Sequence, residues 1–373
     1  MKILLVANTD WFLYNYRLNF ARFLQEQGHE VVLVSPAGEY APALQTAGFR
    51  WVRWEVGRQS LAPWKELDAF WRLAQIYRRE HPDVVYHLTI KPVLYGGLAA
   101  QWMGVPRVLS GITGRGYVLV SNERKARLLR PLALAVYRLI LRSPRQQVLF
   151  ENHLDREYFL SQKLLRREQA HLIPGAGVDV ERFQPALRSH EVPVILFAGR
   201  LLREKGVEEL VEAGKILHQH GERFRLALAG DVDEGNPVSL ERETVQGWVD
   251  SGWVEWWGFQ PRMEEVYAQA DVFVFPSFYG EGLPSVLMEA AACGLPIVAS
   301  DLPGCRAAVE DGVNGFIVPA RDVEALANRL EDLLRSENLR RQMGTASRQI
   351  ALQRFNQNAV NRQILAVMEG KEG

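Results

Sequence analysis

The sequence predicts two α/β domains, each a doubly wound parallel sheet with helices on both faces. Short apolar runs alternate with longer helix-like stretches along almost the whole chain, as in parallel sheets covered by helices. The series of strands ends and then begins again near residue 194. With 373 residues, the chain is too long for one ordinary α/β domain and suits two of about 150 to 200 residues each.

The first series of elements lies in the first half of the chain. A helix is expected at 14–27, where Leu18, Ala21 and Leu24 form an apolar face and Gly28 suits the position after the last turn. The predicted strands are 3–7, 31–35, 51–54, 84–87, 107–109 and 147–150.

A connection rich in proline and glycine, 173–185, follows the first series, and polar residues continue from it to Pro193. We therefore expect one domain at 1–175 and a second at 192–350. A last helix pattern, 357–368, has no docking partner that periodicity can identify. The predicted strands of the second domain are 194–198, 224–229, 254–257, 272–275, 297–299 and 316–318.

Charge is unevenly distributed although the net charge is zero, with 44 basic and 44 acidic residues. Residues 1–170 carry 24 Lys and Arg against 14 Asp and Glu, and residues 171–373 carry 20 against 30, so the halves have charges of +10 and −10. Segment 125–142 mixes basic and apolar residues, which suits either an anionic membrane surface or a solvated face over a core-packing helix. No nucleic-acid-binding motif is present, so we expect no nucleic-acid partner.

Several protein classes are disfavoured. The apolar run after Met1 and Lys2 ends at residue 7, so we expect no secretory signal and a cytoplasmic protein. The longest nearly uninterrupted apolar stretch, 132–141, is far shorter than the roughly 20 residues of a spanning helix. Cys293 and Cys305 have neither metal-ligand nor disulfide spacing.

The strongest functional pattern is 276–294, which follows a predicted strand. Pro284 suits the first turn of a helix, so the backbone amides of Gly282 and Leu283 would point outward and form an anion site. Glu289 lies further along in an otherwise apolar helix, where an ionised carboxylate needs compensation. The hydroxyls of a nucleotide ribose would supply it; an internal salt bridge or a capping contact is the structural alternative.

A second pattern, 197–206, lies at another strand-to-helix junction, where doubly wound sheets bind ligands. Arg200 leaves the strand and Lys205 opens the next helix. Two cations there would stabilise the charge on a departing diphosphate without a metal. Asp231 and Asp233 resemble a metal-binding pair, but they lie among ordinary turn residues, and we expect no metal site and no cofactor.

Together these residues resemble glycosyltransferase family 4, which has the GT-B fold of two Rossmann-like domains facing across a cleft. The likeness rests on Gly199-Arg200 with Lys205-Gly206, on the spacing of Glu281 and Glu289, and on 303–304 with 311–318. Motifs at 13–17, 89–92, 114–117 and 173–179, with Asn152, resemble the subgroup that builds bacterial capsule, O-antigen and protein-glycan precursors.

The resemblance implies a retaining, metal-independent transfer from a UDP-sugar, most often an N-acetylhexosamine donor, to a sugar on a polyprenyl diphosphate. Arg200 and Lys205 match the diphosphate-binding pair, Glu281 the glutamate near the donor sugar, and Glu289 the one on the ribose. The catalytic residues would be Arg200, Lys205 and Glu281. The donor-binding residues would be Gly199, Arg200, Lys205, Glu281, Gly282, Leu283, Pro284 and Glu289.

The same likeness places the acceptor on the first domain and returns the C-terminal helix, within 351–373, to that domain. Acceptor or cleft contacts would come from Asp10, Tyr14, His87, Lys91 and Thr113, although His87 also suits a buried structural role. The sequence departs from the family at Asp10-Trp11-Phe12, where many members have a Gly-Gly pair, and at Thr113, where many have a histidine.

The expected function is therefore sugar transfer in cell-surface glycan assembly, peripheral to the inner face of the cell membrane. Two alternatives keep the fold: an enzyme that acts on soluble acceptors, and a nucleotide-sugar epimerase. A third is a non-catalytic partner in a polysaccharide assembly complex.

Overall fold

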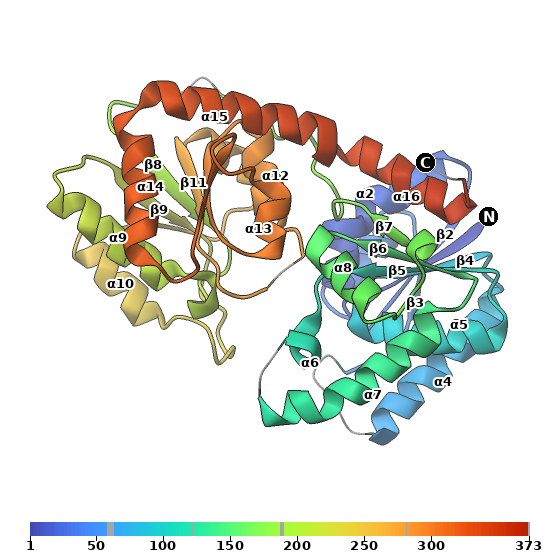
Figure 1. Ribbon diagram of the computed structural model, residues 1–373. Helices are drawn as coiled ribbons and strands as arrows, with labels where there is room; N and C mark the ends of the chain where they lie inside the picture. The colour runs from blue at the N-terminus through green and yellow to red at the C-terminus, as the bar shows by residue number, and fades with distance from the viewer. Residues whose placement is uncertain (58–62, 121–122, 187–189, 281, 372–373) are drawn as a thin grey trace. The chain divides into compact units, whose positions relative to one another are not determined.

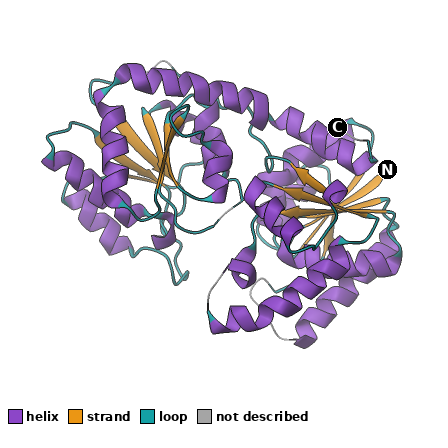
Figure 2. Cartoon of the chain, viewed as in Figure 1, coloured by secondary structure: helices purple, strands orange, loops and turns teal. Residues whose placement is uncertain are grey.

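The computed structural model describes residues 1–57, 63–120, 123–186, 190–280 and 282–371. The chain forms two compact units, one of Met1–Ala176 with the C-terminal residues from Val360 onward, and one of Gly177–Ala359. In each unit the strands are enclosed by helices (Figure 2). Residues Val178, Val180 and Phe183 of the proline- and glycine-rich connection pack into the core of the second unit.

The first unit contains a parallel sheet whose described strands have the order β3-β2-β1-β4-β5-β6-β7. The short strand β7, Ala170–Leu172, was not predicted, because its three residues are too few to show a pattern. All described pairs are parallel: Val32 lies opposite Arg50 at the β2–β3 edge, and Phe150 lies opposite Leu172 at the β6–β7 edge. The other strands are β1 Lys2–Val6, β2 Glu30–Ser35, β3 Arg50–Arg53, β4 Val84–His87, β5 Arg107–Ile112 and β6 Gln146–Phe150.

Helices cover both faces of this sheet (Figure 1). Leu4 and Val6 of β1 pack with α4 and α5, while Ile3 and Leu5 point to the other face and pack with α2 and α16, as alternation along a strand requires. The helical elements are α1 Asp10–Phe12, η1 Leu13–Arg17, α2 Leu18–Glu26, α3 Ala41–Thr46, α4 Pro63–Glu80, η2 Pro92–Gly96, α5 Gly97–Met103, α6 Gly116–Val120, α7 Arg124–Leu141, α8 His153–Ser161, η3 Arg167–Gln169 and α16 Gln357–Glu369.

The helix predicted at 14–27 begins earlier than the apolar pattern indicated. It starts at Asp10 because Thr9 caps it, its Oγ1 accepting a hydrogen bond from the amide of Phe12 at 3.2 Å. Three consecutive elements, α1, η1 and α2, then continue to Glu26. The middle one, η1, has π-helical hydrogen bonding.

The second unit contains a parallel sheet whose described strands have the order β10-β9-β8-β11-β12-β13. These are β8 Val194–Ala198, β9 Arg225–Ala229, β10 Glu255–Gly258, β11 Val272–Phe275, β12 Ile297–Ser300 and β13 Gly315–Val318. The helical elements are η4 Arg203–Lys205, α9 Val207–Gln219, α10 Arg242–Asp250, α11 Met263–Ala268, α12 Ser285–Ala292, α13 Pro303–Ala308, α14 Val323–Arg335, α15 Glu337–Ile350 and η5 Ala351–Phe355.

The winding direction reverses once in each sheet, between β1 and β4 and between β8 and β11. At such a point the loops leaving the carboxyl ends of two neighbouring strands run to opposite sides and leave room for a ligand. Ligands are therefore expected at the residues after β1 and β4 in the first unit and after β8 and β11 in the second.

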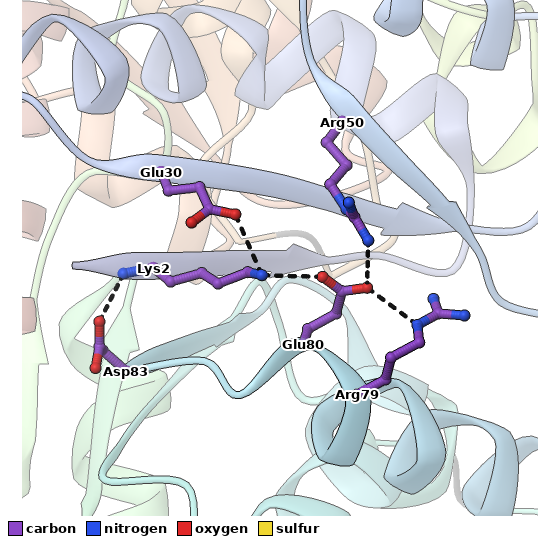
Figure 3. Close-up of polar contacts among 6 residues, drawn as sticks. All are labelled: Lys2, Glu30, Arg50, Arg79, Glu80 and Asp83. Carbon is purple, nitrogen blue, oxygen red and sulfur yellow. Dashed lines mark hydrogen bonds and ion pairs between the residues drawn. The ribbon is translucent and has the colours of Figure 1, made fainter.

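The opposite, amino edge of the first sheet is held by the buried carboxylate of Glu80, at the end of α4 (Figure 3). It accepts hydrogen bonds from Lys2 at 3.0 Å, Arg50 at 2.8 Å and Arg79 at 3.1 Å. Burial by itself raises the pKa of Glu80, but the bonds from Lys2 and Arg50 outweigh it and hold the pKa below its usual value. This network is structural, because it lies away from the edge where ligands bind.

Candidate active site

The loops after β8 and β11 are joined by direct contacts in the second unit. The carbonyl oxygen of Glu204 accepts hydrogen bonds from the amide of Phe278 at 3.0 Å and from Ser277 Oγ at 3.1 Å. Lys205, the next residue, has its Nζ 5.1 Å from the centre of the Phe275 ring. Lys205 is therefore held beside the loop that leads into α12.

A glycine is required where these two loops meet. Gly206 has φ +74°, and a Cβ there would lie 2.2 Å from the carbonyl oxygen of Pro276. Any side chain would therefore both strain the backbone and push the loops apart. The glycine after Lys205 sets the distance between the two loops.

The loop after β8 also meets the loop after β9. A Cβ at Gly230 would lie 1.9 Å from the carbonyl oxygen of Gly199, so the two backbones are in direct contact. The exposed side chain of Arg200 donates to Asp233 Oδ2 at 2.6 Å. Asp231 pairs with Arg242 at 3.1 Å. Both aspartates that resembled a metal pair thus have arginine partners, and the described residues contain no group of three or more potential metal ligands.

The helix α12 begins at Ser285, and Pro284 stands one residue before it as the N-cap, rather than within the first turn. Gly282 and Leu283 are buried immediately ahead of it. Glu281 lies outside the described residues. The predicted donor-binding segment thus leads directly into a helix N-terminus, the end of a helix that attracts anions.

Glu289 lies in α12 as a partly buried carboxylate. Its Oε2 accepts a hydrogen bond from the hydroxyl of Tyr267, at the end of α11, at 2.9 Å. Burial raises the pKa of Glu289 above its usual value, while this hydrogen bond and the charge of Arg182 oppose the rise. Its partner in the structure is therefore a neutral hydroxyl, not the salt bridge or cap that the sequence left open.

Tyr267 is a site residue that sequence reasoning missed. The fully buried ring packs edge-on against Phe183 and Phe273, at 6.0 and 5.6 Å between ring centres, and its hydroxyl also donates to the carbonyl oxygen of Val286 at 3.3 Å. Periodicity marks Tyr267 only as a core residue of a short helix. Nothing local in the sequence indicates that its hydroxyl meets Glu289.

In the first unit, Asp10 and Tyr14 lie in the helical segment after β1. The buried carboxylate of Asp10 accepts hydrogen bonds from the amides of Tyr40 and Ala41, both at 2.8 Å, and thereby caps α3. Tyr14 is partly buried, and its ring lies 5.0 Å from that of Tyr40. The first of these residues fixes a loop, and the second keeps part of its side chain accessible.

His87 ends β4 as a fully buried side chain, and its Nε2 lies 2.8 Å from the hydroxyl of Tyr77. Burial lowers the pKa of His87 to about 3, so the ring is neutral at physiological pH. Its Nδ1 has no hydrogen-bond partner among the described residues.

The other two predicted acceptor residues also lie in the first unit. Lys91 binds the Glu66 carboxylate at 2.9 and 3.0 Å. Thr113 follows β5 and is partly buried.

Two family models match the chain, one in each half. The family model described as glycosyl transferases group 1 matches residues 179–350, which contain the loops after β8 and β11. The model described as glycosyl transferase 4-like matches residues 2–152. The chain is a family 4 glycosyltransferase. It is an enzyme, and its two Rossmann-like sheets form the GT-B fold.

This glycosyltransferase is 27% identical over 99% of its length, and 98% of the other chain, to an N,N'-diacetylbacillosaminyl-diphospho-undecaprenol alpha-1,3-N-acetylgalactosaminyltransferase from Campylobacter jejuni. It is 24% identical over 71% of its length, and 70% of the other, to a UDP-Gal:alpha-D-GlcNAc-diphosphoundecaprenol alpha-1,3-galactosyltransferase from Escherichia coli. Both relatives are named for lipid-linked acceptors.

Solved structures share the fold of this glycosyltransferase over its full length. HepE from Anabaena, solved in complex with UDP, has a TM-score of 0.80 at 20% identity and covers 99% of this chain and 100% of its own. A glycosyltransferase from Rickettsia africae has a TM-score of 0.78 at 19% identity, covering 99% of this chain and 98% of its own. Within the described residues, no helix has both the length and the apolar character needed to cross a bilayer.

Proposed function

We propose that this glycosyltransferase moves a sugar from a UDP-sugar to a saccharide carried on a polyprenyl diphosphate, in the assembly of a cell-surface glycan. The proposed UDP-sugar donor rests on the junction in the second unit. There the Glu204 carbonyl accepts hydrogen bonds from the loop entering α12, which holds Lys205 beside that loop. The proposed polyprenyl-diphosphate acceptor is supported by the full-length likeness to a transferase named for a lipid-diphosphate acceptor.

The donor would lie at the carboxyl ends of β8 and β11. Lys205 and Arg200 would neutralise the leaving diphosphate, for which Arg200 must exchange Asp233 for a phosphate. The backbone around Gly199, Gly282 and Leu283, ahead of Pro284, would approach the phosphates, and Glu281 the donor sugar. Glu289, already oriented by Tyr267, would accept hydrogen bonds from the ribose.

The proposed chemistry is a front-side displacement that retains the anomeric configuration. The acceptor hydroxyl would enter on the face from which the diphosphate leaves and would pass its proton to that diphosphate, while the two cations supply the positive charge that the leaving group needs. In the first unit, Tyr14 and Thr113 are partly exposed at the carboxyl edge and would contact the acceptor. Asp10, His87 and Lys91 would act by shaping the loops around it.

A lipid-linked acceptor would bring the enzyme to the cytoplasmic face of the cell membrane. Helix α7 supports a peripheral location, because its residues Arg124, Arg127 and Arg138 are exposed and Asp and Glu are absent from its sequence. We therefore propose that the enzyme binds the membrane surface without spanning the bilayer.

The test presents a panel of UDP-sugars with a polyprenyl-diphosphate-linked saccharide and identifies products by mass spectrometry. We expect one donor to extend the acceptor by one sugar.

The Lys205→Ala variant should lower turnover by about one to three orders of magnitude, the scale of one lost charge-stabilising donor. Unchanged transfer would remove the diphosphate role, and an epimerised UDP-sugar without acceptor would identify an epimerase. A wild type that binds no UDP would favour a non-catalytic partner.

A further inference from the structure

Large apolar side chains are exposed on three helices of the first unit. On α4 they recur at intervals of three and four residues, which places them on one face of the helix. On α7 the exposed leucines are spaced by four and seven residues and share a face in the same way. These residues, with their exposed fractions, are Trp64 72%, Leu67 58%, Trp71 44%, Trp102 55%, Leu128 83%, Leu132 65% and Leu139 64%.

The three helices that carry these side chains are neighbours. The rings of Trp71 on α4 and Trp102 on α5 are in contact, with centres 4.7 Å apart. Gln101 of α5 donates to the carbonyl oxygens of Leu139 and Ile140 on α7, at 3.3 and 2.9 Å. Helices α4, α5 and α7 accordingly lie side by side (Figure 1). We call the exposed large apolar side chains of these three neighbouring helices the tryptophan–leucine surface.

Tryptophan is an informative part of this surface. Soluble monomers rarely expose contiguous apolar patches larger than roughly a few hundred Å². Tryptophan and tyrosine concentrate at the boundary between lipid headgroups and acyl chains, because the ring is apolar and the indole N–H is a donor. Trp64, Trp71 and Trp102 therefore suit a lipid interface better than they suit water.

Charge identifies the kind of lipid. Arginines Arg124, Arg127 and Arg142 are exposed on and directly after α7, alongside the leucines. The sequence contains no Asp or Glu from residue 124 to residue 150. The α7 part of the surface therefore complements an anionic bilayer, since each basic residue near the surface adds to the attraction. On α4 the exposed Asp68 is paired with Arg72.

We propose that the tryptophan–leucine surface docks the first unit on an anionic bilayer, with the tryptophans of α4 and α5 at headgroup level and the leucines of α7 at the acyl boundary. This inference rests on the proposed function for its purpose, because the acceptor would be anchored in the same bilayer. It assigns binding to three helices rather than to the basic segment alone. Two kinds of contact, apolar and ionic, are what stable peripheral binding requires.

The test measures co-flotation of the full chain with vesicles of phosphatidylethanolamine and phosphatidylglycerol. The doubly substituted variant Trp64→Ser, Trp102→Ser should lower the partition coefficient by about tenfold or more, the scale of losing buried apolar side chains. Both side chains are mainly exposed, so the variant should fold. The matched control is Phe259→Ser, which removes an aromatic side chain that is 77% exposed in the second unit and should leave flotation unchanged.

The possible outcomes separate this surface from the proposed function. Loss of flotation with unchanged transfer to a short-chain, detergent-dispersed acceptor supports the docking surface. Flotation of the double variant equal to wild type overturns it, and so does equal binding to neutral phosphatidylcholine vesicles. If the variant instead abolishes self-association and leaves flotation intact, the surface joins two copies of the chain. A wild type that floats but transfers no sugar would overturn the proposed function alone.

Discussion

At the scale of single residues, the most informative side chain is Glu289. A carboxylate in an apolar helix is costly unless something offsets the loss of water, and here the offset comes from the Tyr267 hydroxyl and the charge of Arg182. Among the described residues, Glu289 accepts one hydrogen bond, which leaves acceptor capacity unused because an ionised carboxylate accepts about four. That capacity suits the hydroxyls of a bound pentose.

Replacing Glu289 with Gln should separate stability from binding. A carboxyl group whose pKa is raised in the folded state weakens stability as pH rises from its unfolded value through its folded value. The Glu289→Gln variant should therefore melt at a higher temperature than wild type at neutral and alkaline pH, with the difference shrinking toward about pH 4. Thermal unfolding at several pH values measures this. A variant destabilised at every pH would show that the carboxylate stabilises the free protein.

In the same variant UDP should bind about ten to a hundred times more weakly, as expected when hydrogen bonds to a charged group are lost. Isothermal titration calorimetry provides the measurement. The control is Glu222→Gln, which alters an acidic side chain in the same unit that pairs with Arg335 at 2.7 Å. Equal UDP affinity in wild type and Glu289→Gln would exclude the ribose role.

At the scale of elements, the site depends on how closely two loops approach each other. Glu204 and Ser277 are 73 positions apart in sequence, yet they are hydrogen-bonded because β8 and β11 are neighbours in the sheet. The predicted strands β8 and β11 match the observed bounds, Val194–Ala198 and Val272–Phe275. Apolar runs locate strands well, but their order in the sheet depends on packing between distant segments.

The Gly206→Ala variant tests this junction. We expect turnover to fall by about tenfold or more, because a Cβ 2.2 Å from the Pro276 carbonyl displaces Lys205 from the α12 loop. The matched control is Gly221→Ala, since Gly221 has φ +83° but nothing within 4 Å of its Cβ position. Steady-state kinetics and thermal unfolding of both variants measure the effect. Equal activity in the two variants would mean that the loop spacing is not needed for catalysis.

At the scale of the whole molecule, the chain consists of two units of the same architecture with different chemistry. The donor residues lie in the unit of net negative charge, and the exposed tryptophans lie in the basic one. The last helix belongs by its contacts to the first unit: Val360, Ile364 and Met368 pack in the core with Ile3 and Leu5.

Hydrogen exchange of the full chain with and without UDP should report this division. We expect slower exchange on binding in the segments after β8 and β11 and at the start of α12, because a bound ligand stabilises the state that holds it. The amides of α4, α5 and α7 should not change. Protection confined to the first unit would place the nucleotide there and contradict the donor assignment.

The sequence by itself determined the alternation of strands and helices, the restart of the series near residue 194 and the motifs that place the chain in its family. These features depend on local periodicity and on glycine, proline and charge at fixed spacings, so they can be recognised without coordinates. Only the tertiary structure decided that Arg200 meets Asp233, that Tyr267 orients Glu289, and that three helices combine their exposed tryptophans and leucines. Those contacts join residues far apart in the chain, and their geometry is set by how whole elements pack.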